Sequence, residues 1–370
     1  YRGKQVVVAG DNKQLRPNHL YKIRWEDETE DTPALEIESL LELAERHLMN
    51  VQLRGHYRSR SLDLIDFSNV EFYKGRLTLL PDFRVINDIE PSIEYLNVQG
   101  VWENNINERE ASEVVRLIHQ ITDSDPLKEI GVVTFNARQQ NYIIDRVEES
   151  FAEKKKLIPE SLFIKNIENV QGDERDIIIF STAYGKDPNG KLMMQFGSLN
   201  QVGGENRLNV AVTRAREKIY LVTSVSPDQL KVDEAVNEGP KLLKKYLKYA
   251  TNVSEGNYTP SFPEIERLAG PWQLKDHLFS WAVDSSPDYE LIEELPFADV
   301  TAKKDGRYIG LLLTDDDLYY NSISVKENHV YKPLMLSEKR WRFQWVSTRD
   351  YWSKREEVVD SIRRFLYNST

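Results

Sequence analysis

The sequence predicts an α/β fold with a parallel sheet, followed by a second, smaller α/β unit. Apolar segments of strand length alternate with amphipathic helical segments between about residues 53 and 223, a pattern typical of a parallel sheet covered on both faces. After about residue 269 a shorter set of strands begins that is rich in aromatic residues. The 370 residues suffice for two or three packed cores at ~100–200 residues per domain.

The elements of the larger unit follow from the spacing of apolar residues. A short apolar run at 6–9 predicts a buried strand that ends in Gly10-Asp11, and helical spacing between 37 and 48 predicts a helix. Further along the chain we predict helices at 111–121, 143–151 and 208–216, and strands at 130–135, 161–165, 176–182 and 218–223.

The remaining third of the chain divides into a connector and the smaller unit. Residues 226–268 are mostly polar and are predicted to be a linker with one helical patch. In residues 269–370 the apolar pattern predicts strands near 308–313 and 341–346, and a closing helix at 354–366.

Composition excludes several kinds of site. The chain has no cysteine, which excludes disulfides, thiolate zinc sites and thiol nucleophiles, and its six His residues are too scattered to predict a metal site. No apolar run approaches the ~18 residues of a membrane span, and no signal peptide is visible. We therefore expect a cytoplasmic protein without a membrane partner. The net charge of −11 argues against a dedicated nucleic-acid-coating protein, although a motor needs only one basic groove.

Two polar segments in the first sixty residues carry candidate ligand-binding groups. Residues 10–17 (GDNKQLRP) follow the predicted strand and place the amide of Gln14 where it can hydrogen-bond a terminal phosphate. An ordinary polar turn is the alternative. Residues 53–60 (LRGHYRSR) set Tyr57 beside Arg58, a ring that can stack on a base next to a guanidinium fork that can grip phosphate. The alternative here is a solvated basic face.

Two further segments follow in the larger unit. Residues 170–176 (VQGDERD) contain Gly172, which lets the backbone approach a ligand closely, and Glu174, which can accept bonds from ribose hydroxyls. Residues 207–216 (RLNVAVTRAR) predict a helix with Arg at fixed intervals, and Arg214 suggests a charge aimed at a phosphoryl transition state. Because parallel sheets bind ligands at the carboxyl ends of their strands, we expect these segments at those ends.

Taken together and in this order, the four segments resemble motifs III, IV, V and VI of superfamily 1 helicases, whose consensus is roughly GDxxQLxP, YRS, QGxExD and LNVAxTRAR. One departure is Asn206, where close relatives often carry a second Arg. Residues 130–140 also resemble the nucleic-acid-facing strand and loop of the second RecA-like domain. The resemblance is closest to the branch that includes the nonsense-mediated-decay helicase and many large bacterial proteins with a nuclease-like tail.

The resemblance implies the C-terminal part of an ATP-dependent helicase or translocase that uses ATP and Mg²⁺. Its implied partners are single-stranded DNA or RNA and a first RecA-like domain of the same protein. The site residues that it implies are Gln14, Arg58 and Arg214 at the γ-phosphate, Tyr57 near adenine, and Gly172 and Glu174 at the ribose.

The family also requires a Walker A loop and an acidic Mg²⁺-binding motif before motif III, and neither is present. Residues 185–191 match GxxxxGK, but Leu192 follows where Ser or Thr would hold Mg²⁺, so we interpret them as a turn-rich loop. We therefore expect that the chain alone hydrolyses no ATP. The expected domains are the end of the first RecA-like domain (1–50), the second RecA-like domain (51–225), the linker (226–268) and a restriction-endonuclease-like domain (269–370).

The last hundred residues resemble the restriction-endonuclease-like domain that follows such helicases. These nucleases need an Asp, then an acid and a Lys on the adjacent strand, to hold Mg²⁺ and activate water. Asp299 is present, but Leu312 and Thr314 stand where the acid and the Lys belong, and the acids at 315–317 are out of register. We therefore predict an inactive domain with no metal site. Two alternatives remain: a non-catalytic nucleic-acid-binding or assembly module, and an active nuclease in which a neighbouring acid completes the metal site.

Overall fold

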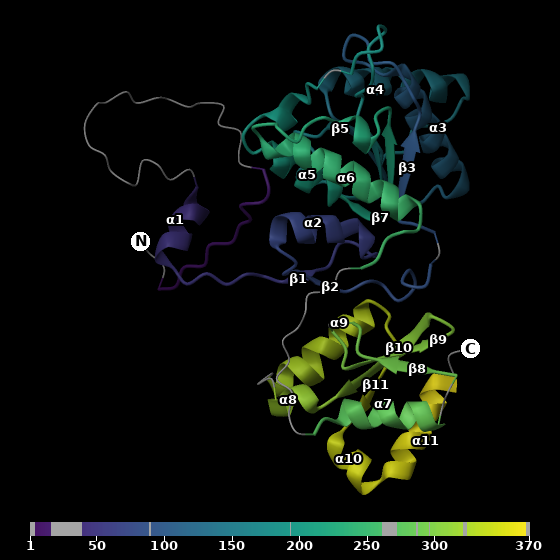
Figure 1. The fold of residues 1–370 in the computed structure, drawn as a ribbon. Coiled ribbons are helices and arrows are strands. Elements are labelled where there is room, and N and C mark those ends of the chain that lie inside the picture. The colour runs from purple at the N-terminus through teal and green to yellow at the C-terminus, as the bar shows by residue number, and fades with distance from the viewer. Residues whose placement is uncertain are drawn as a thin grey trace, which may run out of the picture. The chain divides into compact units, whose positions relative to one another are not determined.

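The described part of the chain forms two compact units in the computed structural model (Figure 1). Unit 1 comprises Tyr1–Arg54 and Ile93–Asn252, and unit 2 comprises Gly55–Ser92 and Val253–Thr370. The residues described are 4–15, 39–88, 90–192, 194–260, 272–285, 288–295, 297–320 and 324–367.

Unit 1 is built on a parallel sheet with the strand order β3-β7-β6-β4-β5. All residues of β4 are buried, as expected for a strand of a parallel sheet that is covered on both faces. The predicted parallel α/β fold is therefore confirmed. The strands are β3 (Ile93–Asn97), β4 (Ile130–Thr134), β5 (Phe163–Asn166), β6 (Arg175–Ser181) and β7 (Ala215–Thr223).

Two long helices, α3 (Glu108–Ser124) and α4 (Ala137–Glu153), cover one face of this sheet (Figure 1). Their apolar residues, such as Val114 and Ile143, join the apolar side chains of β4 and β6 in one buried cluster. Each helix begins at an Asn whose side chain accepts a backbone N–H of the first turn, which satisfies one of the free donors at a helix start.

The opposite face of the sheet is covered by α6 (Glu238–Ser254), whose Tyr246 ring lies 6.5 Å from the ring of Phe180 in β6 (Figure 1). The range predicted as a linker thus contributes a packed helix to unit 1. The shorter helices of this unit are α1 (Leu40–His47), α5 (Gly204–Val212) and 3₁₀ turns at Gly197–Asn200 and Pro227–Gln229.

Two predicted elements of unit 1 are wrong. Residues 6–9 form no strand, and Val6 and Val7 are 67% and 82% exposed. No strand of the described residues pairs with this segment, so no neighbouring strand covers Val6 and Val7. The helix predicted at 208–216 ends at Val212, because Ala215 already pairs with Arg175 in the sheet.

Unit 2 contains a mixed sheet with the order β11-β10-β9-β8. Strand β10 is antiparallel to β9 and parallel to β11, and β8 is antiparallel to β9. The smaller α/β unit is therefore confirmed, whereas its assignment as restriction-endonuclease-like stays a prediction. The strands are β8 (Glu290–Ile292), β9 (Val300–Lys304), β10 (Arg307–Thr314) and β11 (Phe343–Val346).

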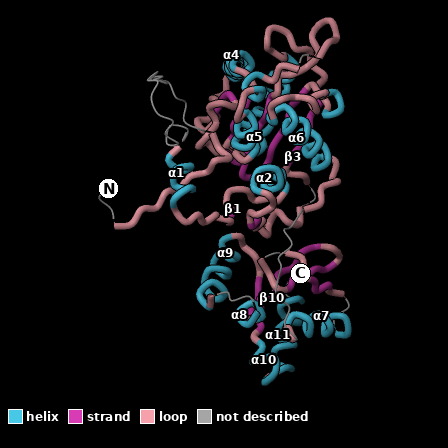
Figure 2. Tube along the Cα trace, turned by 60° about the vertical axis from the view of Figure 1, so that its left-hand side comes forward, coloured by secondary structure: helices cyan, strands magenta, loops and turns pink. Residues whose placement is uncertain are grey.

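The two faces of this sheet carry different cores. Leu312 points into a cluster with residues of α7, α10 and α11, whereas its neighbour Leu313 belongs to a cluster with Leu80 and Trp341. Figure 2 shows α7, α10 and α11 on one side of β10 and α9 on the other. The helices are α7 (Leu274–Ser285), α8 (Asp316–Tyr320), a π-helical turn at Glu327–Tyr331, α9 (Lys332–Glu338), α10 (Thr348–Ser353) and α11 (Arg355–Tyr367).

Residues 55–92 belong to unit 2, although the sequence places them in a 51–225 domain. They form α2 (Asp63–Tyr73) and a parallel pair of short strands, β1 (Gly55–His56) and β2 (Thr78–Leu79). The reason for this grouping is the apolar segment after β2, which packs into the core of the C-terminal sheet. The predicted boundary at 268 lies outside the described residues.

None of the helices in the described ranges is long and apolar enough to cross a membrane.

Candidate nucleotide and nucleic-acid sites

Gly172, Glu174 and Arg214 lie at the amino ends of their strands. Strand β6 begins at Arg175 and β7 begins at Ala215, and these two residues are partners in the parallel pair. The expectation that both segments lie at carboxyl ends is therefore wrong. That rule concerns loops that leave strands, whereas both of these segments lead into strands. The two segments meet where the parallel strands begin, which we call the amino edge of the sheet. We call the opposite end, where the parallel strands finish, the carboxyl edge.

Arg214 is buried and joins the two segments. Its side chain is only 4% exposed, its Nε donates to the carbonyl of Val210 at 2.7 Å, and its Nη1 lies 3.4 Å from the carbonyl of Asp173. The prediction that Arg214 lies within a helix is wrong, since it follows the helix end, and its side chain turns inward. Because the side chain is buried, a contact between Arg214 and a phosphate requires it to move toward the surface.

The other two candidate residues of this edge are more accessible. Gly172 has φ +89° and open space around its Cα, so a glycine is favoured there by the left-handed backbone rather than by crowding. The side chain of Glu174 is 37% exposed, and its Oε1 lies 3.8 Å from Nη1 of Arg216. Because the Glu174 carboxylate reaches solvent, it can accept a hydrogen bond from a ligand hydroxyl in its present position.

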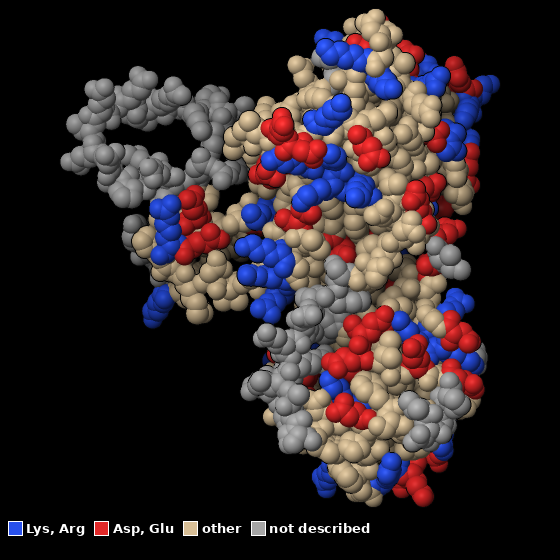
Figure 3. Space-filling model, in the orientation of Figure 1, with Lys and Arg blue, Asp and Glu red and all other residues tan. Residues whose placement is uncertain are grey.

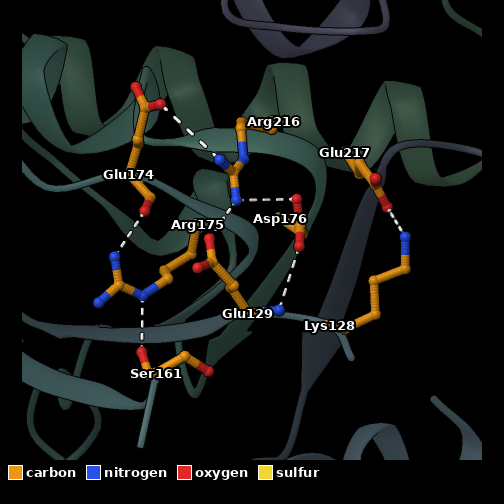
Figure 4. A network of polar contacts seen from close by, with 8 residues as sticks. All are labelled: Lys128, Glu129, Ser161, Glu174, Arg175, Asp176, Arg216 and Glu217. Atoms are coloured by element: carbon orange, nitrogen blue, oxygen red, sulfur yellow. Dashed lines mark hydrogen bonds and ion pairs between the residues drawn. The ribbon is translucent and has the colours of Figure 1, made fainter. Parts of the chain in front are cut away.

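Charged side chains converge at the amino edge from the starts of several strands (Figure 4). Arg216 pairs with Asp176 at 3.0 Å and with Glu129, and Lys128 pairs with Glu217. Most of these groups are partly exposed, and such ion pairs contribute only ~0–1 kcal/mol each. The amino edge therefore holds charges that can exchange partners at little cost.

The loop that carries Gln14 is attached to α5 in the same unit. Asn209 of α5 donates from its side-chain amide to the carbonyl of Lys13 at 2.8 Å, and the Gln14 amide donates to Asp11 at 3.1 Å. The structure thus brings the Gln14 loop to the helix that leads to Arg214. Residues 16 and 17 of this segment lie outside the described residues.

Asn206, the departure from the family pattern, also takes part in this attachment. Its side-chain amide lies 3.4 Å from the carbonyl of Asn12. Sequence reasoning missed the tethering role of both asparagines of α5. Their spacing of three residues, which places them on one helix face, is the signal that could have revealed it.

Tyr57 and Arg58 lie in unit 2, immediately after β1. The Tyr57 side chain is 77% exposed, and the Arg58 guanidinium carbon lies 5.8 Å from its ring centroid. Lys and Arg side chains gather around β1 in the space-filling view (Figure 3). The side chain of His56 fixes the turn, because its Nε2 accepts the backbone N–H of Ser59 at 3.0 Å. The structure thus places Tyr57 and Arg58 in unit 2. The other four candidates lie in unit 1: Gln14, Gly172, Glu174 and Arg214.

The carboxyl edge of the unit 1 sheet carries a buried network of uncharged groups around one carboxyl group. Gln139 accepts the backbone N–H of Asn107 at 2.8 Å and donates to Ser181 at 3.0 Å. Glu110 is fully buried and accepts bonds from Ser181 at 2.9 Å and from the Ala183 N–H at 2.7 Å. Burial raises the pKa of Glu110 to about 7, although these hydrogen bonds act in the opposite direction.

This network was not predicted from the sequence. The spacing Asn107-x-x-Glu110 resembles a helix start and is the signal that could have placed both residues together. The segment 130–140, predicted to face nucleic acid, does reach this edge at the end of β4. Its exposed cation is Arg138, whose Nη1 donates to the carbonyl of Asn104 at 3.3 Å.

In unit 2, Asp299 is buried at the start of β9. Its Oδ2 accepts the backbone N–H of Thr314 at 2.8 Å and lies 3.4 Å from Nζ of Lys332. Leu312 is fully buried among apolar residues. The position predicted to lack the nuclease acid is therefore part of an apolar core.

The acids that follow β10 are engaged in structural bonds. Asp315 accepts the backbone N–H of Thr348 at 3.0 Å, and Asp316 accepts the N–H groups of Leu274 and Lys275 at the start of α7. Across the residues that the structure describes, no group of three or more His, Asp or Glu side chains is arranged to hold a metal ion.

Comparisons with known proteins identify the family of the chain. A family described as "AAA domain" matches residues 37–226. An uncharacterized ATP-dependent helicase of Mycoplasma pneumoniae, the MG140 homolog, is 30% identical over all of this chain and 35% of its own length. MG140 of Mycoplasma genitalium, also named an uncharacterized ATP-dependent helicase, is 38% identical over 69% of this chain and 24% of its own length. A Regulator of nonsense transcripts 1 homolog of Neurospora crassa is 25% identical over 59% of this chain and 20% of its own length.

The chain spans about a third or less of the length of these relatives. The matched family range covers half of the chain and includes the segments around Tyr57, Glu174 and Arg214. The parallel sheet of unit 1 is the architecture expected of a RecA-like domain. The chain therefore belongs to the AAA-domain family of superfamily 1 helicases.

Proposed function

We propose that this chain supplies the nucleotide-sensing and strand-contacting half of an ATP-dependent superfamily 1 helicase or translocase. The observation that carries this proposal is the set of hydrogen bonds that connects three motif segments within unit 1. Arg214 bonds to the segment that contains Gly172 and Glu174, and α5, which leads to Arg214, holds the Gln14 loop. These hydrogen bonds connect three segments that are distant in the chain, which supports a shared ligand for them.

In this proposal, ATP lies against the amino edge. Gln14 donates to the γ-phosphate, Arg214 releases an internal bond to contact the same group, and Glu174 accepts a ribose hydroxyl. The family resemblance assigns Tyr57 to adenine and Arg58 to a phosphate.

Mg²⁺ would neutralise phosphate charge when bound. We propose, as the family resemblance implies, that a first RecA-like domain of the same protein supplies its ligands together with the Walker A loop.

The carboxyl edge is the proposed contact for a single strand of DNA or RNA. Arg138 is exposed there at the start of α4, and the buried network around Gln139 fixes that helix start to β6. Strands β4, β6 and β7 run from one edge to the other. A displacement of the amino edge when the γ-phosphate is lost would therefore also displace the carboxyl edge, where the single strand of DNA or RNA is proposed to bind.

The test is ATP hydrolysis by the full-length protein with and without single-stranded DNA or RNA. We expect turnover that the strand stimulates, within the usual range of about 1–100 s⁻¹ for phosphoryl-transfer enzymes. The chain of residues 1–370 alone should show none. Strand binding by the full-length protein without any ATP turnover would instead favour a non-catalytic nucleic-acid-binding module.

We also propose that residues 269–370 have a restriction-endonuclease-like fold that does not cut. An alkyl side chain at Leu312 cannot ligate Mg²⁺, which requires oxygen ligands, and Asp315 and Asp316 already accept backbone N–H groups. The test is incubation of the full-length protein with single- and double-stranded DNA and RNA in Mg²⁺ or Mn²⁺. Cleavage that is lost on Asp299→Ala would overturn this proposal.

A further inference from the structure

The turn after α9 holds the segment that carries Tyr57. The side-chain ammonium of Lys339 donates to the carbonyl of Tyr57 at 3.1 Å and lies 3.4 Å from the carbonyl of Ser59. These two carbonyls flank Arg58 in the chain. One ammonium group thus fixes the backbone on both sides of the residue expected to contact phosphate.

The same turn also binds the chain after β2. The indole N–H of Trp341 donates to the carbonyl of Pro81 at 2.8 Å, and the backbone N–H of Phe83 donates to the carbonyl of Lys339 at 3.0 Å. The Trp341 and Phe83 rings lie 5.1 Å apart in a buried cluster. This attachment is therefore both hydrogen-bonded and apolar, which sets the position from which Lys339 reaches Tyr57.

A second attachment joins this segment to β10. The Asn87 side chain donates to the carbonyl of Tyr308 at 2.9 Å and accepts the Tyr308 N–H at 2.8 Å. Both backbone polar groups of one strand residue are thus matched by one amide. Residues 55–92 are consequently built onto the C-terminal sheet at two separate places.

The chemistry at Lys339 differs from that of an ordinary surface lysine. The pKa of Lys339 is lowered, first because burial disfavours the charged form, with Arg60 acting in the same direction. Asp82 opposes this effect. A partly desolvated ammonium makes stronger bonds to carbonyl oxygens than a solvated one. Because the Tyr57 side chain is exposed, its orientation depends on the backbone that Lys339 and His56 hold.

We propose that Lys339 is a positioning residue of the nucleotide site, which holds the segment Tyr57–Ser59 so that the Tyr57 ring and the Arg58 guanidinium are ready to grip ATP. This inference rests on the proposed function, because it needs Tyr57 and Arg58 to contact the nucleotide. Unit 2 would then contribute to nucleotide binding through Lys339.

The test compares three variants of the full-length protein. Lys339→Met removes the ammonium, Lys339→Arg keeps a charged donor, and Lys354→Met changes a solvent-exposed lysine of the same unit that pairs with Glu357. We expect Lys339→Met to raise KM for ATP about tenfold, the equivalent of about 1.4 kcal/mol, with kcat within about twofold, since a preorganised segment chiefly affects binding. Lys339→Arg should recover most of this loss, and Lys354→Met should match the wild type.

Hydrogen exchange of residues 55–61 supplies a second readout. Lys339→Met should speed exchange there without lowering the melting temperature of the protein. A wild-type KM together with unchanged exchange in Lys339→Met would overturn the inference. A wild-type protein that hydrolyses no ATP would overturn the proposed function instead, and faster exchange in Lys339→Met would then still support the restraint of the segment.

Discussion

The two edges of the unit 1 sheet use polar residues in opposite ways. At the amino edge, charged side chains such as Glu129, Asp176 and Arg216 form partly exposed ion pairs. At the carboxyl edge, Asn107 and Gln139 form a buried network of amide and hydroxyl groups around a single carboxyl group. The first edge can exchange its partners for those of a ligand, whereas the second is already satisfied within the fold.

This difference separates charged groups that a ligand can contact from a buried network that stabilises the fold. Exposed ion pairs contribute ~0–1 kcal/mol, so a phosphate or a ribose can replace them at low cost. A buried polar network loses much more when one member is left unpaired. We therefore expect substitutions of the exposed groups at the amino edge to change nucleotide chemistry and those in the buried network to change stability. Substitution of the buried Arg214 should change both.

The largest expected effect is on Arg214. In the full-length protein, Arg214→Ala should lower ATP turnover by about 10³ or more, because arginine fingers contribute roughly 10³–10⁵ in rate. The fold should also lose stability, by about 1.5–3 kcal/mol as for a lost hydrogen bond to a charged group, since the side chain is buried and bonded to Val210. Steady-state turnover and thermal melting measure the two effects separately.

Arg214→Lys separates charge from geometry, because a lysine keeps the charge but cannot make the same forked contacts. Arg146→Ala, which removes an exposed arginine of α4 that pairs with Glu149, is the matched control and should leave both quantities unchanged. Retention of more than about a tenth of wild-type turnover in folded Arg214→Ala would exclude a finger role, given the usual scale of such effects.

At the carboxyl edge we expect a dependence of stability on pH that comes from Glu110. Its pKa is raised from 4.5 to about 7 in the folded protein, so the folded state binds the proton more tightly than the unfolded state. Stability from this group is therefore greatest at low pH and falls by about 3 kcal/mol as pH rises from about 4.5 to 7, at 1.36 kcal/mol per pKa unit. Above pH 7 its contribution is level.

Glu110→Gln removes this titration and tests its sign. Between pH 4.5 and 7.5, urea-unfolding midpoints should show the wild-type chain losing stability relative to Glu110→Gln. Glu149→Gln, at an exposed position of α4, should keep the wild-type pH dependence. A difference that is constant over this range, or that grows in the other direction, would show that Glu110 is ionised in the folded protein throughout.

The sequence predicts the elements of the sheet better than the position of the site on it. Apolar periodicity locates β4, β6 and the helix α3 because each buries one face or both in the same core. It fails at 6–9, where burial would need a neighbouring strand, and at 55–92, whose packing partner lies more than 200 residues away. The local apolar pattern shows neither whether a neighbouring strand covers residues 6–9 nor which distant segment packs against residues 55–92.

The motifs show the same limit within the site. Their order and composition indicate the family, but not the edge at which they lie, because a motif beside a strand can precede it or follow it. The inward turn of Arg214 depends on where α5 ends and β7 begins, a boundary that residue spacing does not resolve. The buried Glu110 depends on its partners from β6, which are distant in the chain.

The most direct test of the two-edge account is a crossed binding measurement on the full-length protein. Glu174→Gln changes the amino edge and Arg138→Ala the carboxyl edge, with Glu149→Gln and Arg146→Ala as controls. We expect Glu174→Gln to weaken binding of a non-hydrolysable ATP analogue about tenfold, as for one lost bond to a charged group, and to leave single-strand affinity unchanged. Arg138→Ala should weaken strand binding a few-fold, lower its salt dependence by about 0.7 in slope, and leave nucleotide affinity unchanged. Loss of both affinities in either variant, or the reverse assignment, would contradict the separation of the two edges.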